Sequence, residues 1–142
     1  MNRMVLLGFL LGACSGNSPT DGGDDTSVVF EAREAVTDGG TWQVSYVPVP
    51  DPIPATDNFE LLLTINQSET GESVVDAEIT VVASMPAHNH FMNTTPVVTA
   101  NGDGTYGVSG MQFHMSGHWQ IDVTVELDDV AETALFHTEC CE

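Results

Sequence analysis

The chain contains no lysine, and its two arginines face twenty-one acidic residues, which gives a formal net charge of −19 over 142 residues. Such a surface repels the phosphate backbone of nucleic acids and attracts cations through its long-range field. The charge therefore predicts that the protein does not bind nucleic acid. Because an acidic surface also keeps a protein soluble in a salty medium, the charge alone is a weak indication of metal binding.

Long apolar runs are also missing. The apolar run at residues 4–11 is too short to cross a bilayer as a permanent helix. Together with Arg3 before it and small residues after it, the run is typical of a bacterial signal segment, and Leu11-Gly12-Ala13-Cys14 resembles the lipobox of bacterial lipoproteins. The pattern predicts a signal peptide at 1–13 and a lipid on Cys14, which would anchor the protein to a membrane of the cell envelope. The alternatives are an ordinary secretory signal cleaved nearby and a wrongly placed start codon.

Only three cysteines are present. If Cys14 carries a lipid, the adjacent pair Cys140 and Cys141 has no distant partner. Three possibilities stay open for that pair in an oxidising envelope. The two cysteines form a disulfide with each other, form a disulfide with another molecule, or bind a soft metal ion together with His137. Residues 14–27 hold too little apolar surface to fold, and they predict a flexible tether or simply a frayed end.

The rest of the chain, 28–142, alternates apolar and polar residues in short runs separated by turn signals, and no window shows a helical stripe. About seven strands predict one all-β domain, a small antiparallel immunoglobulin-like β-sandwich, with an open barrel as the alternative. The inward faces expected from the alternation are Trp42/Val44/Tyr46, Phe59/Leu61/Leu63/Ile65, Ala77/Ile79/Val81/Ala83 and Trp119/Ile121/Val123/Val125/Leu127.

The connections are predicted from their turn residues. The segment Asn101-Gly102-Asp103-Gly104 separates two apolar runs and tolerates positive φ, so it predicts a hairpin. The run 131–138 follows Asp128-Asp129 and is expected to close a sheet. Prolines at every second position from 48 to 54 are expected to prevent ladder pairing and to form an extended crossover or an edge.

Four of the five histidines and four of the six methionines fall between residues 85 and 119. His88, His90 and Met92 follow one another at spacing two, which in an extended segment puts all three on one face. Imidazole binds copper in either oxidation state and thioether sulfur favours Cu(I), so these residues predict half of a copper site. Met85 continues an inward strand face and is expected to pack in the core.

The second half of the cluster precedes the strand that begins near Trp119. If Phe113 and Met115 point inward, His114 points outward, whereas the direction of His118 after a glycine is unpredictable. Connections at one end of a sandwich can bring His88, His90 and His114 together. The alternative is that the methionines fill the end of the core and the histidines cap it.

As a set, these motifs resemble the YtkA-like domain, which is related to the FixH-like group. The resemblance covers roughly residues 50–128 and rests on Pro-Asp-Pro-Ile-Pro at 50–54, Met-Pro-Ala-His-Asn-His-Phe-Met-Asn-Thr-Thr-Pro at 85–96, Gly-Asp-Gly-Thr-Tyr at 102–106 and Gly-Met-Gln-Phe-His-Met-Ser-Gly-His-Trp at 110–119. It implies an immunoglobulin-like sandwich in a secreted or membrane-attached bacterial protein, associated with copper or heavy-metal handling. The positions that match the family pattern are Met85, His88, His90, Met92, His114 and Met115. The chain departs from that pattern at Phe91, where glycine is more usual, and at His118.

The sequence therefore predicts a lipid-anchored envelope protein that binds copper and buffers it or transfers it to a partner protein. The alternative is a structural or interaction module without metal. An enzyme is not expected, because no catalytic triad, phosphate loop or pair of catalytic carboxylates can be argued. His88-Asn89-His90 shares the His-x-His pattern of copper-zinc superoxide dismutases, but the rest of their ligand set cannot be located here.

Overall fold

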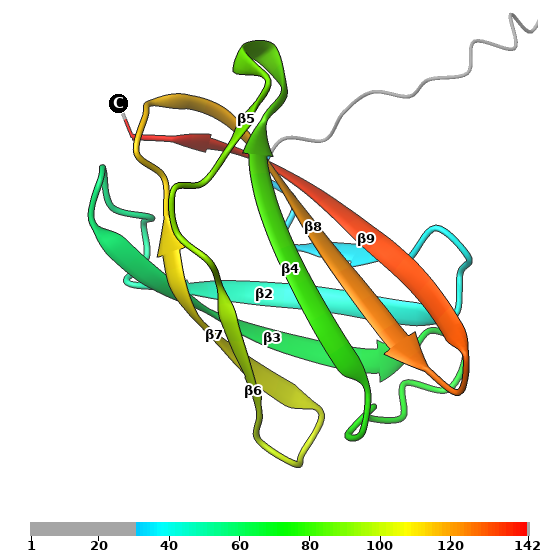
Figure 1. The fold of residues 1–142 in the computed structure, drawn as a ribbon. Helices are drawn as coiled ribbons and strands as arrows, with labels where there is room; N and C mark the ends of the chain where they lie inside the picture. The colour runs from blue at the N-terminus through cyan, green and yellow to red at the C-terminus, as the bar shows by residue number, and fades with distance from the viewer. Residues whose placement is uncertain (1–30, 142) are drawn as a thin grey trace, which may run out of the picture.

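The computed structural model describes residues 31–141, so the predicted signal peptide, Cys14 and the tether lie outside the described residues. Nine strands form two antiparallel sheets, one ordered β1-β2-β3-β7-β6 and the other β5-β4-β8-β9, stacked as two layers (Figure 1). The strands are β1 Glu34–Val36, β2 Trp42–Val49, β3 Asn58–Gln67, β4 Glu78–Met85, β5 His90–Phe91, β6 Val97–Ala100, β7 Thr105–Gln112, β8 Gly117–Leu127 and β9 Val130–Cys140.

Two separate sheets confirm the β-sandwich and exclude the open barrel. The count is nine strands rather than about seven, because β1 and β5 are only three and two residues long and are too short to show a pattern in the sequence. Within residues 31–141 the only helical element is one 3₁₀ turn, Pro86–His88, and no helix there is long and apolar enough to cross a membrane.

The core lies between the layers and consists of the inward faces that the alternation predicts. The alternating residues from Trp119 to Val125 are fully buried, as are most of those from Trp42 to Tyr46 and from Phe59 to Ile65. Ala77 and Leu127, at the ends of their runs, are only partly buried. Period-two alternation predicted this core because each strand buries one face against the opposite sheet.

The hairpin predicted at residues 101–104 forms, and a second hairpin joins β8 to β9. In the β6–β7 hairpin, Gly102 and Gly104 have positive φ, and the Asp103 carboxylate accepts hydrogen bonds from Thr105. Asp128 and Asp129 both have positive φ and join β8 to β9 in a two-residue turn, the arrangement that matches the twist of a hairpin. The expected closing strand is therefore β9.

The expectation that the prolines stop ladder pairing is wrong for Pro48. This residue lies within β2 and pairs with Leu61 of β3. The amide of Tyr46, two residues earlier, points to the other side and donates to Arg33 before β1. Pro48 has the same parity, so its nitrogen faces the same edge of β2 as the Tyr46 amide, but β1 pairs only with residues 43–45 and does not reach Pro48. No ladder hydrogen bond is therefore lost at Pro48. Only residues 50–57 form an irregular connection.

A β-bulge in β7 changes which residues face the core. Phe59 pairs with Met111, but Leu61 pairs with Val108, so the two residues between Met111 and Val108 oppose one residue of β3. Gly110 occupies the bulge with φ of 77°. Because of the extra residue, the core-facing positions change from even numbers to odd numbers at the bulge. Val108 is buried before it, and Met111 and Phe113 are buried after it.

Candidate functional site

The first half of the site is a tight reversal at the end of β4. Pro86 begins a 3₁₀ turn, Asn89 takes a left-handed conformation, and β5 then returns along β4, where His90 pairs with Met85. The expected extended segment is therefore wrong at His88, which lies in the turn. Met92 donates its amide to the Ala83 carbonyl and continues the pairing. Alternation then puts His90 and Met92 on the inward face of this edge.

The second half is the connection from β7 to β8, residues 113–116. Phe113 stacks on Trp119, with ring centroids 4.5 Å apart and an 8° angle between planes, and its edge meets Phe59 at 4.9 Å. The Trp119 indole N–H donates to the Met115 carbonyl at 2.9 Å, which holds the connection over the ring. The Met115 side chain is 41% exposed, so the expectation that it points inward is wrong. Strand parity does not extend past Gln112, where β7 ends.

These two halves bring three predicted histidines together. The ring centroids of His90 and His114 are 5.0 Å apart, and that of His88 is 5.8 Å from His90. Both His90 and His114 also meet Trp119, at 5.9 Å and 5.5 Å, in edge-to-face geometry. His114 therefore turns toward the core end and not outward, because the chain bends at the end of β7. The gathering of residues 24 positions apart in sequence agrees with the predicted cluster.

Two ring nitrogens in this cluster are buried without a partner. Neither Nε2 of His90 nor Nδ1 of His114 has a hydrogen-bond partner among the described residues. The other nitrogen of His90 lies 3.4 Å from the Phe91 carbonyl, a long contact. Leaving a buried polar atom unpaired costs about 1–3 kcal/mol, so such atoms in native proteins call for an explanation. A bound metal ion is one, since imidazole nitrogen is a common metal ligand.

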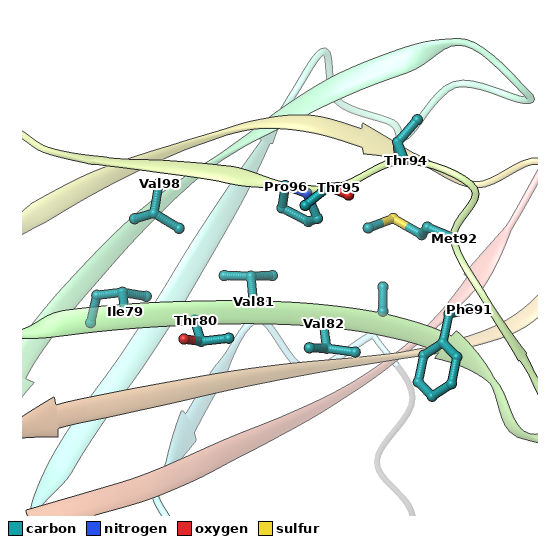
Figure 2. Close-up of a pocket in the computed structure, with 11 residues that line it drawn as sticks. Ile79, Thr80, Val81, Val82, Phe91, Met92, Thr94, Thr95, Pro96 and Val98 are labelled. Carbon is teal, nitrogen blue, oxygen red and sulfur yellow. The ribbon is translucent and has the colours of Figure 1, made fainter.

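Two methionines flank His90. Met85 is 2% exposed and lies directly across the β4–β5 pair from it. Met92 is partly buried, and its sulfur accepts the Gln112 amide N–H at 3.4 Å. Figure 2 shows the Met92 side chain directed along a groove between β4 and residues 94–98. The groove has a volume of about 480 Å³ and is lined mainly by aliphatic and threonine side chains.

The histidines do not form a ready three-ligand site. Within residues 31–141, no three His, Cys, Asp or Glu side chains have their donor atoms gathered for one metal ion. His88 is exposed on the turn, and its ring is adjacent to His90 alone among the ring contacts of the described residues. Of the predicted ligands, the structure therefore brings His90 and His114 together, keeps His88, Met85 and Met92 beside them, and separates Met115 from the buried part.

A second histidine pair was missed in the sequence. Nε2 of His118 lies 2.8 Å from Nδ1 of His137 on neighbouring strands β8 and β9. The signal for this pair was present, because a two-residue turn at 128–129 fixes the register that places Gln120 opposite His137. His137 and Cys140 alternate to opposite faces, and Cys140 is joined to Cys141 by a disulfide. Of the three possibilities for the cysteine pair, the structure has the disulfide between neighbours.

A comparison with protein families finds one match, the model described as YtkA-like, over residues 38–124. The match covers more than half of the chain and includes both histidine-bearing connections. It begins twelve residues before the region in which the motifs were recognised, because β2 belongs to the matched domain. Neither the curated proteins nor the solved structures include a match to this chain.

Proposed function

The chain belongs to the YtkA-like family, and from that membership and the geometry of its histidines we propose that it is a non-catalytic, lipid-anchored protein of the bacterial envelope that binds copper. It buffers the metal or passes it to a partner protein. The anchor part of the proposal rests on the lipobox-like residues ending at Cys14. The copper part rests on the cluster around His90 and His114.

The observation that carries the proposal is the pair of buried imidazoles with orphan nitrogens. Nε2 of His90 and Nδ1 of His114 are withdrawn from water, and their rings lie 5.0 Å apart. A metal ion bound by both nitrogens would offset the desolvation of each. Trp119, which is stacked on Phe113, contacts both imidazole rings, so little side-chain order has to be created when the ion binds.

The chemistry of the neighbours favours Cu(I). Two imidazoles and a thioether form a soft ligand set, and Met85 supplies the thioether nearest in register, directly across from His90. A rotation of the Met92 side chain would offer a second sulfur. His88 and Met115 are exposed beside the buried pair. In the proposal they form the rim where copper enters and where a partner protein takes it up.

The test is metal binding by the full-length chain, purified in mild detergent without a histidine tag. We expect Cu(I) to bind at the cluster with one equivalent and to change the fluorescence of Trp119, whose ring contacts both histidines. His90→Gln combined with His114→Gln should abolish that signal. Met111→Leu, a buried change outside the cluster, is the control for core perturbation. An unchanged Cu(I) titration in the double variant would reject the site.

The second candidate is an interaction module that binds no metal. The observation that favours it is that the described residues contain no preformed group of three ligands. Under this alternative, His90 and His114 only cap the Trp119 end of the core. Under this alternative, copper changes neither the melting temperature nor the tryptophan fluorescence. A ligand that binds only the native state raises the melting temperature, which makes thermal unfolding with and without Cu(I) decisive.

A further inference from the structure

The outer face of the β8–β9 hairpin carries a pair of imidazoles that the copper proposal does not use. His118 and His137 lie diagonally across the strand pair, with ring centroids 5.0 Å apart and planes inclined by 38°. Side chains at alternate positions from 119 to 125 point into the core, so those at 118, 120 and 122 face the other way. The pair therefore lies on the face of β8 and β9 opposite to Trp119, whose ring contacts His90 and His114.

We propose that His118 and His137 form a second metal site, a two-imidazole chelate for Cu(II) on the outer face of β8 and β9. The inference does not depend on the copper site around His90. Its central observation is the 2.8 Å separation of Nε2 of His118 and Nδ1 of His137.

This separation matches the spacing of two neighbouring ligands in a tetragonal complex. With metal–nitrogen bonds of about 2.0–2.1 Å, an angle of 90° at the metal separates the two nitrogens by about 2.8–3.0 Å, whereas a tetrahedral angle separates them by about 3.3–3.4 Å. Square-planar or tetragonal geometry with nitrogen and oxygen ligands is characteristic of Cu(II) and Ni(II). In the absence of metal, an N–H···N hydrogen bond between the rings accounts for the same contact. The ion replaces that hydrogen bond when each ring turns by about 45°, so that both nitrogen lone pairs converge on the ion instead of lying along the line between the two nitrogens.

The scaffold under the pair is rigid. β8 and β9 are paired continuously from Gly117–Cys140 to Leu127–Val130, and the backbone spacing of the two histidines is therefore fixed. His118 follows Gly117, whose φ of 122° is available to glycine and lets the chain enter β8 at this angle. Preorganisation of both ligands on paired strands lowers the entropy cost of chelation.

The surroundings favour a cation with oxygen ligands. Asp122 is on the same face, and the Gln120 side-chain amide donates to its carboxylate at 3.0 Å. Glu139 lies directly opposite His118 across the strand pair. Burial and the neighbouring His118 lower the pKa of His137 below its ordinary value, against the opposing effect of Asp122, which keeps the ring in the neutral form that binds metal. Water and a carboxylate would complete the coordination shell.

The test uses Cu(II) and isothermal titration calorimetry on the full-length chain in detergent, without a histidine tag. The His90→Gln/His114→Gln variant lacks the inner site and should retain one Cu(II) equivalent. Adding His118→Gln or His137→Gln to it should remove that equivalent or weaken it at least tenfold. The control is Gln43→His on the far sheet, which adds a lone imidazole and should not restore binding. Zn(II) should bind more weakly than Cu(II), following the general order of affinity.

A second measurement needs no substitution at the pair. Substoichiometric Cu(II) should broaden the amide resonances of Gln120 and Thr138 on β8 and β9 and leave those of β6 sharp. If the broadening is absent from β8 and β9, or if the His118→Gln change leaves the Cu(II) affinity unaltered, the two rings share only a hydrogen bond and the proposal is wrong. Failure of the His90–His114 site is distinct, because it appears as a loss of the Cu(I) signal at Trp119 with Cu(II) binding at the hairpin intact.

Discussion

At the scale of single residues, the histidines of this chain have different roles because their surroundings differ. His90 and His114 have ring nitrogens buried beside Trp119, whereas His88 is exposed on a turn only 5.8 Å from His90. His118 and His137 share a short contact on the opposite face of the same sheet. The residue type suggested metal binding throughout, but the surroundings divide the histidines between the proposed Cu(I) site and the proposed Cu(II) chelate.

The methionines next to His90 provide a prediction about oxidation state. Met85→Leu combined with Met92→Leu removes both thioethers and keeps the buried volume, so each change should cost less than about 1.5 kcal/mol of stability. We expect Cu(I) affinity to fall at least tenfold while Cu(II) binding by the histidines persists. Competition titrations with a chromogenic Cu(I) chelator measure the first quantity. Equal Cu(I) affinity in the variant would show that imidazoles alone bind the ion.

Glu132 is a second residue whose surroundings give it a defined role. Its carboxylate accepts hydrogen bonds from the hydroxyls of Thr37 and Thr41, each at 2.5 Å, and from the Thr41 amide at 3.0 Å. Gly39 allows this approach, since a β-carbon there would collide with the carboxylate. The hydrogen bonds from Thr37 and Thr41 lower the pKa of Glu132 below its ordinary value. The carboxylate thereby ties β9 to the turn between β1 and β2.

The lowered pKa of Glu132 sets the sign of a pH effect. A carboxyl group with a lower pKa in the folded state adds stability at pH values above its ordinary pKa, and that stability is lost as the pH falls through the folded value. Glu132→Gln should therefore lower the melting temperature at pH 7, and the difference from wild type should shrink below about pH 4. Glu78→Gln removes the same charge from an exposed position and is the control. A constant difference across the whole pH range would contradict the assignment.

At the scale of elements, two local irregularities position the inner site. The turn at Pro86–His88 and the left-handed Asn89 return the chain onto β4, which places His90 opposite Met85. The bulge at Gly110 shifts the parity of β7 and buries Phe113 against Trp119. The turn sets the direction of the chain that carries His88 and His90, and the bulge sets the direction of the connection that carries His114. The site therefore depends on where the strands end as much as on the strands themselves.

Substitution at the bulge should be costly in a specific way. In Gly110→Ala the new β-carbon would lie 3.1 Å from the Thr95 carbonyl oxygen, at a φ that alanine rarely adopts. We expect a loss of about 1–3 kcal/mol in the free energy of unfolding, measured with chemical denaturant. The control in the same strand is Gly107→Ala, which meets no atom within 4 Å and should be neutral or stabilising by about 0.5–1 kcal/mol. Equal losses of stability at both positions would show that the bulge does not require glycine at position 110.

At the scale of the whole molecule, acidic charge is nearly unopposed. Arg33 is the only lysine or arginine among residues 31–141, and it forms a bidentate ion pair with Asp51 at 2.5 and 2.8 Å. Both side chains are roughly 40% exposed, so the pair adds little to stability. The remaining carboxylates repel one another and attract cations.

This imbalance predicts the response to salt. Raising the NaCl concentration from about 0.02 M to 0.5 M shortens the Debye length to a few ångströms and screens the repulsion between carboxylates. We expect the melting temperature to rise, by about 4–8 °C for each kcal/mol of repulsion removed in a domain of this size. Differential scanning calorimetry at constant pH measures the shift. A melting temperature that falls with NaCl would show that attractive ion pairs outweigh the repulsion.

The sequence by itself determined the architecture. Alternation of apolar residues in runs such as 119–125 sufficed to predict which faces are buried, because a strand has only two faces and one of them must leave water. The hairpin at 101–104 followed from residues that tolerate positive φ. The motif set also led to the family that matches residues 38–124. These features depend on neighbours in the chain, which the sequence displays directly.

Only the tertiary structure decided which side chains meet at the two histidine clusters. His114 turns inward and Met115 outward because β7 ends at Gln112, and parity carries no information beyond the end of a strand. Pro48 remains in a ladder because of where β1 stops. The contact between His118 and His137 required the register of a hairpin. The direction of a side chain in a connection, and the distance between residues on different strands, depend on contacts that are remote in sequence and therefore appear only when the sheets are assembled.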